Sequence, residues 1–531
     1  MKKIHLLDCT LRDGGFVNQW RFGEECIINI FERLQLSGMD IIEVGYLRDR
    51  VSFDLDETQF PDTASIGKLL PSKISEETSV VAIIDYGDCS LDRISPCADS
   101  VLDGIRVTFK QKDMLQALSF CKEIKKKGYF VSLQPVSFMD YTPQDVLDLV
   151  AGANELMPLA VCIVDTYGFM NKRDLLRYYS LMDATLEPEI ALGYHSHNNF
   201  QLAYSNAVEF IEQFTQRRMI VDCSVMGMGK GAGNAATELM ALYINNYMGG
   251  DYDVNQILEI ADTYIEKEKK KNDWGYSLKY YIAASNYCHP RYVSFLLNKK
   301  TLSIKSINEV ISRIDPEKKT RYDEEHIVFL YQEFQKKCVD DHASYAELRA
   351  AIGDRPILVL APGSSLLKEK EKIEGYVRKS DPYIISINHF SELYRSDAVF
   401  VSNHKRYSQI ALRMKKHPSG ARVIATSNID PATLEVDLYL NYSSLLVDDQ
   451  AVSDNATLML VNAMIKMGSK EVTLAGFDGY KSEGSNYFND GWDFMGQSWL
   501  QNEAIEAAVK RLEEKISIRF LTESLYRKRA E

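Results

Sequence analysis

Residues 190–197 read IALGYHSH, an apolar run that ends in two histidines at alternate positions. A strand buried on both faces of a parallel sheet needs such a continuous apolar run. Other runs of this kind occur between residues 3 and 225. They are IHLLDCT (4–10), DIIEVGYL (40–47), VVAIIDY (80–86), GIRVTF (104–109), FVSLQPV (130–136), AVCIVDT (160–166) and MIVDCSV (219–225).

The intervals between these eight runs leave room for crossover helices. The first part of the chain is therefore predicted to fold as a (β/α)8 TIM barrel, and an open sheet fits less well. Catalytic groups of this fold lie where the strands end and in the loops that follow. Arg12 and Asp13 follow the first run, Thr166 ends the sixth, and GMGKGAGN (227–234) follows the eighth. The polar residues are thus placed as the barrel requires.

Composition indicates a globular protein with at least two domains, because 531 residues exceed a single core of roughly 250 to 300 residues. Apolar residues make up 45% and charged residues 26%, which excludes a largely disordered chain. The net charge of -13 argues against a nucleic-acid partner. No apolar run is long enough for a membrane span, and the nine cysteines are scattered without a C-x-x-C pair. We expect reduced thiols and a cytoplasmic protein.

Three parts are predicted along the chain. They are a TIM barrel (1–245), a helical extension at the barrel mouth (246–345) and a Rossmann-like α/β domain (353–531). Amphipathic stretches around the Tyr-rich WGYSLKYYIAASNYCHPRY (274–292) indicate the extension. Strand, turn, helix and strand alternate again from PILVLAPGSS (356–365), which indicates the last domain.

The HSH motif points to a metal site. Residues two apart in a strand point the same way, so His195 and His197 present two imidazoles to one side. Asp13 is the natural third ligand, and Asn234 in the loop after the eighth strand adds an amide oxygen. Imidazole and carboxylate ligands with open water positions suit Mn or Mg better than a closed zinc site. For HSH alone, two solvated histidines at a strand end are an open alternative.

Arg12 lies directly before Asp13. A fixed guanidinium beside a divalent cation suits the negative charge that develops on a carbonyl oxygen during enolate chemistry. Glu43, within the second strand, is expected to orient Arg12 through a bidentate pair. Taken alone, an Arg-Asp dipeptide is usually a surface pair and a strand glutamate is often structural.

DCTLRDGG (8–15), Glu43, HSH and GMGKGAGNAATE (227–238) together resemble the DRE-TIM metallolyase (HMGL-like) superfamily. This superfamily includes 3-hydroxy-3-methylglutaryl-CoA lyase, isopropylmalate synthase and 4-hydroxy-2-oxovalerate aldolase. VDTYGFM (164–170) and VDCSVMGMGKGAGN (221–234) are most similar to the aldolase branch.

This resemblance implies a divalent metal on Asp13, His195 and His197 with Asn234 nearby. It also implies that Arg12 stabilises an enolate and that Thr166 lies near the carboxylate of a 2-oxo acid. A homodimer is a further expectation from the family.

The function predicted from the resemblance is a metal-dependent aldolase or lyase that uses the metal-bound enolate of a 2-oxo acid such as pyruvate. GFVNQW (15–20) is similar to barrels found beside surface-polysaccharide genes, which extends the prediction to a sugar-derived aldehyde. One alternative is a Claisen-type synthase or lyase that uses acetyl-CoA. Another is a non-catalytic sugar-nucleotide binding or assembly protein.

Phe16 departs from the aldolase branch, which carries a catalytic histidine three residues after the metal aspartate. The group that moves the proton is therefore open. The candidates are His289, Tyr276, Tyr167 and a metal-bound water, and a structural role in the Tyr-rich segment is equally good for His289. The glycines of residues 227–234 also have two explanations, a phosphate approaching the backbone or simple loop geometry.

APGSSL (361–366) follows a predicted strand and precedes a predicted helix. Gly363, Ser364 and Ser365 are therefore candidates to bind a nucleotide phosphate through backbone amides. The alternative is a tight turn with a serine helix cap.

Asn388, Asn403, His404 and Asp478 lie at later strand ends, where ligands bind in open α/β sheets. Together with PGSSL and TLMLVNAMIKMG (457–468), they resemble a sialyltransferase-like or MptE-like Rossmann family. This resemblance implies a nucleotide, a sugar nucleotide or a phosphorylated sugar as ligand.

Overall fold

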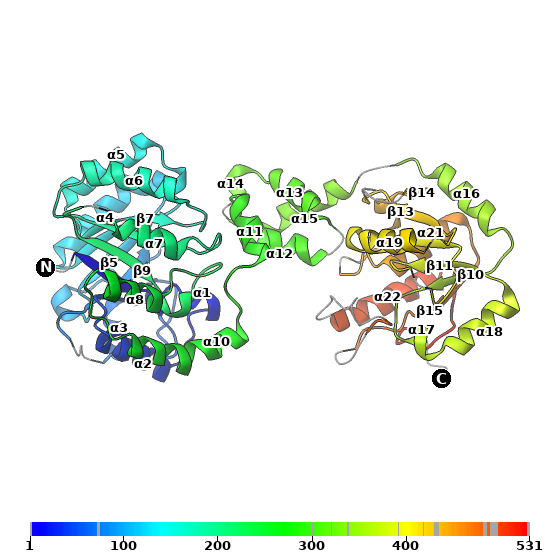
Figure 1. Cartoon of the computed structure of the whole chain (residues 1–531), viewed down its shortest axis with the longest axis horizontal. Helices are drawn as coiled ribbons and strands as arrows, with labels where there is room; N and C mark the ends of the chain where they lie inside the picture. Colours follow the sequence, from blue (N-terminus) through cyan, green and yellow to red (C-terminus); the bar gives the residue numbers. More distant parts are fainter. Residues whose placement is uncertain are drawn as a thin grey trace. The chain divides into compact units, whose positions relative to one another are not determined.

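The chain forms two compact units, Met1–Pro290 and Arg291–Glu531 (Figure 1). The computed structural model describes residues 3–71, 75–213, 215–299, 302–319, 321–336, 339–390, 392–417, 419–429, 435–449, 451–481, 486–488 and 498–527. The boundary between the units falls inside the predicted extension 246–345, and the division into three parts stays a prediction.

Eight parallel strands of the first unit close into a barrel, which confirms the predicted (β/α)8 fold. They are β1 (Ile4–Asp8), β2 (Ile41–Leu47), β4 (Ser79–Asp85), β5 (Gly104–Phe109), β6 (Phe130–Pro135), β7 (Ala160–Asp165), β8 (Ala191–Ser196) and β9 (Met219–Cys223). Their order is β1, β9, β8, β7, β6, β5, β4 and β2, and β2 pairs with β1 to close the ring. The short β3 (Gln59–Phe60) pairs with the end of β2.

Helices follow most of the barrel strands. They are α1 (Gly15–Asn18), α2 (Glu24–Leu36), α3 (Thr63–Leu69), α4 (Met114–Lys126), α5 (Pro143–Leu156), α6 (Lys172–Thr185), α7 (Ala203–Ile211) and α8 (Thr237–Tyr247). The connection after β4 has only two short 3-10 turns, Leu91–Arg93 and Cys97–Asp99. Pro96 and the aspartates and serines around it favour turns over an α-helix, so this connection lacks one.

The interior of the barrel changes from apolar to ionic along the strands. Leu7, Ile41, Val81, Ala160, Ala191 and Ile220 pack together inside it. Glu43 and Asp222 lie two residues beyond Ile41 and Ile220, so the strand period also turns their carboxylates inward. There both meet Arg106 of β5. The ionic layer lies on the side of the carboxyl ends, where the candidate site is found.

The Tyr-rich segment after the barrel lies on loops at the carboxyl ends of the strands. The first unit continues after the barrel with α9 (Val254–Ile260), a π-type turn (Ala261–Ile265) and α10 (Glu266–Lys271). The Tyr-rich segment itself contains α11 (Leu278–Ser285). Trp274 Nε1 donates to the carbonyl of Met226, in the loop after β9, at 3.2 Å. Tyr287 packs against Tyr167 and Phe169, in the loop after β7.

The second unit contains a seven-stranded, all-parallel sheet. Its helices are α12 (Pro290–Lys299), α13 (Ile304–Ser312), α14 (Pro316–Lys319), α15 (Glu324–Gln335), α16 (His342–Ile352), α17 (Ser365–Lys368), α18 (Lys370–Ser380), α19 (His404–Lys416), α20 (Tyr442–Leu445), α21 (Ala456–Met467) and α22 (Asn502–Glu513). Its strands are β10 (Ile357–Leu360), β11 (Tyr383–Ile387), β12 (Ala398–Val401), β13 (Arg422–Thr426), β14 (Leu438–Leu440), β15 (Glu471–Ala475) and β16 (Ser517–Phe520).

Helices cover both faces of this sheet. Val359 of β10 packs in a core with residues of α16, α21 and α22, whereas its neighbours Leu358 and Leu360 pack in another core with residues of α17 and α18. The strand order is β14, β13, β12, β11, β10, β15 and β16, so the chain reverses its direction of growth at β10. The α/β class is as predicted, and membership of a Rossmann-like family stays a prediction.

None of the helices in the described ranges has both the length and the apolar character that a bilayer crossing requires. No disulfide joins the cysteines that the structure describes, and Cys338 lies outside the described residues.

Candidate active site

Asp13, His195 and His197 meet at the carboxyl ends of the barrel strands. Each offers a ligand atom, and the three atoms lie within 4.8 Å of one another. All three side chains are buried, with exposed fractions of 1%, 5% and 6%. The two rings are 5.1 Å apart and nearly perpendicular at 88°. The predicted ligands thus come together from the end of β8, the residue directly after it and the loop after β1.

This donor set fits a divalent cation. One carboxylate and two imidazoles leave positions for water or substrate, as Mn or Mg requires. His195 Nδ1 is hydrogen-bonded to Asp222 at 2.9 Å, which leaves Nε2 for a cation. Within the described ranges, the buried Nδ1 of His197 and Oδ1 of Asn234 have no hydrogen-bond partner. A cation between these groups would satisfy them.

Asn234, predicted as a further ligand, contacts Asp13 directly. Its Nδ2 donates to Asp13 Oδ2 at 2.8 Å, and the backbone N–H of Lys230 donates to the same oxygen at 3.1 Å. A Cβ atom at Gly229 would lie 2.5 Å from that oxygen. Gly233 has φ +87° and packs against the Gly227 carbonyl. Backbone geometry therefore favours glycine at position 233, and close packing against Asp13 and Asn234 favours it at position 229.

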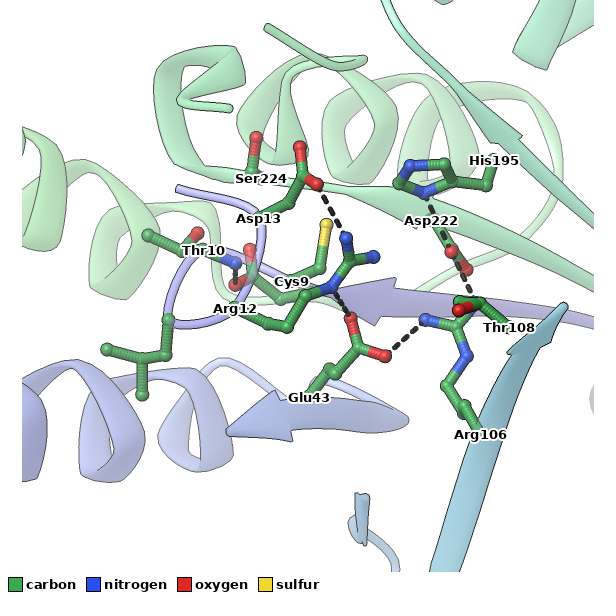
Figure 2. A network of polar contacts seen from close by, with 12 residues as sticks. Cys9, Thr10, Arg12, Asp13, Glu43, Arg106, Thr108, His195, Asp222 and Ser224 are labelled. Atoms are coloured by element: carbon green, nitrogen blue, oxygen red, sulfur yellow. Dashed lines mark hydrogen bonds and ion pairs between the residues drawn. The ribbon is translucent and has the colours of Figure 1, made fainter. Parts of the chain in front are cut away.

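Arg12 lies between two carboxylates (Figure 2). Its Nε donates to Glu43 Oε2, and its Nη1 donates to Asp13 Oδ1 at 2.5 Å. Glu43 Oε1 accepts instead from Arg106 Nη1 at 2.8 Å. Glu43 thus bridges two arginines with one oxygen each, where the sequence had suggested a bidentate pair with Arg12 alone.

Arg106 and Asp222 complete this network and are absent from the predicted site residues. Arg106 Nη2 donates to Asp222 Oδ2 at 2.5 Å, and the same oxygen accepts from His195 Nδ1 (Figure 2). The sequence does contain a sign of these two residues, because each is the one charged residue in an apolar strand. Arg106 lies in GIRVTF and Asp222 lies in MIVDCSV. Such a charge is buried at high cost unless an opposite charge meets it.

Neighbouring groups of opposite charge keep the buried arginine and aspartate side chains of this network ionised. Burial opposes the positive charge of Arg106, but Asp222 and Glu43 raise its pKa above the ordinary value. Burial alone would raise the pKa of Asp13, but Arg12 and then His197 hold it below the ordinary value. Burial lowers the pKa of His197 to about 3 against the attraction of Asp13. At neutral pH these ligands are a carboxylate and a neutral imidazole, the forms that bind a metal.

Thr166 lies directly after β7 and is partly exposed. Its Oγ1 accepts from the backbone N–H of Ser137 at 2.7 Å, which leaves the hydroxyl proton for another acceptor. Ser137 has φ 57°, a left-handed conformation that is uncommon outside glycine. Its Oγ donates to the phenol oxygen of Tyr167 at 3.3 Å. One strained residue therefore holds both Thr166 and Tyr167.

The candidates for proton transfer have different surroundings. Tyr167 is partly buried, and burial raises the pKa of its phenol. Tyr276 is 61% exposed, and His289 is partly buried directly before α12. Phe16 lies against Trp20 with ring centres 4.7 Å apart. Of the three candidate side chains, only Tyr167 is a neighbour of Thr166 in the chain.

The residues predicted to bind a nucleotide lie in the second unit. Gly363, Asn388 and Asp478 line a cavity of about 700 Å³. The backbone N–H of Ser365 donates to Asp478 Oδ2 at 2.8 Å, and its hydroxyl donates to Oδ1 at 2.5 Å. Ser364 Oγ also donates to Asp478, at 3.3 Å. The amide expected to meet a phosphate therefore already meets a carboxylate.

Residues 3–263 match the family described as HMGL-like. An oxaloacetate decarboxylase of Mycobacterium tuberculosis is 24% identical over 237 residues, which are 44% of this chain and 68% of that protein. A 4-hydroxy-2-oxovalerate aldolase of Pseudoalteromonas translucida is 24% identical over 273 residues, which are 50% of this chain and 76% of that protein.

The solved N-terminal domain of a Bacteroides vulgatus protein is 23% identical, with a TM-score of 0.49 over 57% of this chain and 99% of that domain. The match of residues 3–263 shows that the barrel of this chain is similar to HMGL-like proteins, and its relatives by sequence are lyases and aldolases.

Proposed function

We propose that the first unit is a divalent-metal-dependent aldolase or lyase acting on the carbon–carbon bond between the α and β carbons of a 2-oxo acid, counted from its ketone carbonyl. The meeting of Asp13, His195 and His197 within 4.8 Å carries this proposal. A divalent cation bound there supplies Lewis acidity to a carbonyl oxygen. Relatives named oxaloacetate decarboxylase and 4-hydroxy-2-oxovalerate aldolase support a 2-oxo acid as the substrate class.

Arg12 supplies a fixed positive charge beside this site. Its bonds within the described ranges engage Nε and Nη1, so Nη2 is the nitrogen left for a substrate oxygen. Glu43 holds Arg12 and is itself held by Arg106, which fixes the guanidinium before substrate binds. Such a prearranged charge stabilises the enolate oxygen without reorganisation during the reaction.

We assign Thr166 to the substrate carboxylate, because its hydroxyl keeps a proton to donate. For proton transfer we compare three variants, Tyr167→Phe, Tyr276→Phe and His289→Gln. Exchange of the methyl protons of pyruvate with D2O, followed by NMR, isolates the proton-transfer step from bond cleavage. The responsible group is the one whose loss abolishes this exchange while Mn²⁺ binding is retained.

The direct test measures pyruvate release from 4-hydroxy-2-oxopentanoate by the full-length chain, coupled to lactate dehydrogenase. Turnover is expected to disappear in EDTA and to return with Mn²⁺ or Mg²⁺. Asp13→Asn should abolish it, whereas Asp54→Asn, a change at a carboxylate that is 41% exposed and pairs with Arg21, should not. Turnover that persists undiminished in EDTA refutes the metal-dependent proposal.

Two further substrates separate the reactions within this class. Oxaloacetate yields pyruvate without an aldehyde, so aldehyde release distinguishes aldol cleavage from decarboxylation. Pyruvate with glyceraldehyde or erythrose tests a sugar-derived aldehyde, as a role in polysaccharide biosynthesis would require. Acetyl-CoA with pyruvate tests the Claisen alternative, which releases a thiol. The dimer expected from the resemblance is tested by sedimentation.

A further inference from the structure

Lys230 is an exposed cation in the loop after β9, beside the candidate active site. Within the described ranges, no carboxylate forms an ion pair with its ammonium group. Arg12 and Arg106 differ in this respect, because each of them contacts two carboxylates. A positive charge that the protein does not neutralise attracts an anionic ligand.

The backbone of Lys230 is held against a candidate metal ligand. Its N–H donates to Asp13 Oδ2 at 3.1 Å. Two residues further on, the N–H of Ala232 donates to Asn199 Oδ1 at 2.8 Å. Gly231 lies between them with φ +72°, a conformation that favours glycine. The loop therefore fixes the point from which the Lys230 side chain extends.

The side chain of Lys230 reaches Phe16 of α1. Its Nζ lies 5.5 Å from the centre of the Phe16 ring, and the face of an aromatic ring attracts a cation at this distance. Phe16 follows Asp13 by three residues and is 38% exposed. Its ring also contacts Trp20 and Tyr46, at 4.7 and 6.3 Å between ring centres. An ammonium group and an exposed aromatic surface thus lie together beside Asp13.

The charge of Lys230 also acts on the ligand His197. Burial is the largest cause of the low pKa of His197, and the positive charge of Lys230 lowers this pKa further. Because the force between charges falls with distance, the ammonium group is close enough to act on a substrate bound at these ligands.

Lys230 and Thr166 lie on different sides of the two histidines. The strand order places β8 between β7 and β9. Thr166 follows β7, His195 and His197 lie at the end of β8 and directly after it, and Lys230 lies in the loop after β9. Thr166 is assigned above to the carboxylate of the 2-oxo acid. Lys230 is therefore placed to meet the other reactant.

We propose that Lys230 selects an aldehyde partner that carries an anionic group, either a carboxylate or a phosphate. The ammonium group binds this anion as a point charge, and the Phe16 ring covers the carbon chain between the anion and the aldehyde. This inference rests on the proposed function, because it assigns the second reactant of the same reaction. In the synthetic direction, the methyl carbon of pyruvate loses a proton and bonds to the aldehyde carbon, whose oxygen gains a proton.

Two matched pairs of aldehydes test the charge, succinic semialdehyde with butanal and glyceraldehyde 3-phosphate with glyceraldehyde. NMR follows their addition to pyruvate by the full-length chain in Mn²⁺. In at least one pair, kcat/KM should be about tenfold higher for the anionic aldehyde, and the pair with the larger ratio identifies carboxylate or phosphate. Ratios near one in both pairs overturn this inference and leave the proposed function standing. Absence of EDTA-sensitive product with all four aldehydes overturns both.

Lys230→Met should bring this ratio close to one through a higher KM for the anionic aldehyde, and Lys230→Arg should keep most of the ratio. The ratio cancels any general loss of activity in a variant. Lys126→Met is the matched control, because Lys126 is an exposed lysine in the last turn of α4 that pairs with Glu123 at 2.6 Å. It should keep the wild-type ratio. A wild-type ratio in Lys230→Met overturns the assignment to Lys230.

Discussion

Arg106→Met removes the one positive charge that joins Glu43 to Asp222 inside the barrel. Arg106 is 2% exposed and donates to these carboxylates at 2.8 and 2.5 Å. Methionine is a long apolar side chain without the charge, so the variant tests the ionic contacts more than the packing. It leaves two buried carboxylates facing a thioether.

Removing one partner of a buried ion pair costs roughly 3–5 kcal/mol of unfolding free energy. Arg106 serves two carboxylates, but Arg12 still bonds Glu43 and His195 still bonds Asp222, which limits the loss. At about 2–4 °C per kcal/mol for domains of roughly 150–250 residues, the melting temperature of the barrel should fall by about 6–20 °C.

Circular dichroism melts of the full-length chain in EDTA measure this change. The barrel transition is identified as the one whose melting temperature rises when Mn²⁺ is added to wild type, because a ligand stabilises the unit that binds it. Arg50→Met is the control, because Arg50 is an exposed residue that contacts Asp88 at 3.2 Å. Such a pair contributes about 0–1 kcal/mol. If Arg106→Met melts within about 2 °C of the control, the ionic layer does not stabilise the barrel.

Asp222→Asn should weaken Mn²⁺ binding about 10- to 100-fold in calorimetry, because His195 loses its carboxylate partner; unchanged affinity would contradict that role. Gly229→Ala should also weaken Mn²⁺ binding, because its methyl would approach Asp13 Oδ2, whereas Gly375→Ala meets open space and should not. Burial raises the pKa of Asp8 from 3.8 to about 6, so the folded state holds this proton more tightly than the unfolded state. The stability that Asp8 contributes through this proton is therefore present below pH 3.8 and lost as pH rises to about 6. The melting temperature of wild type relative to Asp8→Asn should fall over this window in EDTA, and a constant difference would show that Asp8 does not titrate there.

The barrel and its candidate metal ligands could be predicted from local patterns. Eight apolar runs indicated eight buried strands, and the structure has a strand at each. The period of two placed His195 and His197 on one side, and the fold places strand ends on one rim. The strand period acts within one strand, and the common rim of strand ends follows from the barrel architecture. Both can therefore be predicted without knowledge of any tertiary contact.

The partners of the buried charges were decided only by the tertiary structure. Arg106 and Asp222 are 116 positions apart, and Ser365 and Asp478 are 113 positions apart. Periodicity states that a strand side chain faces inward, but the register of the closed barrel determines which inward charge it meets. The same holds at the PGSS turn after β10. Its sequence predicts an anion site, but in the fold Asp478, which follows β15, places a carboxylate against this turn. Strand register and long-range packing are collective properties of the whole fold, and a single stretch of sequence does not contain them.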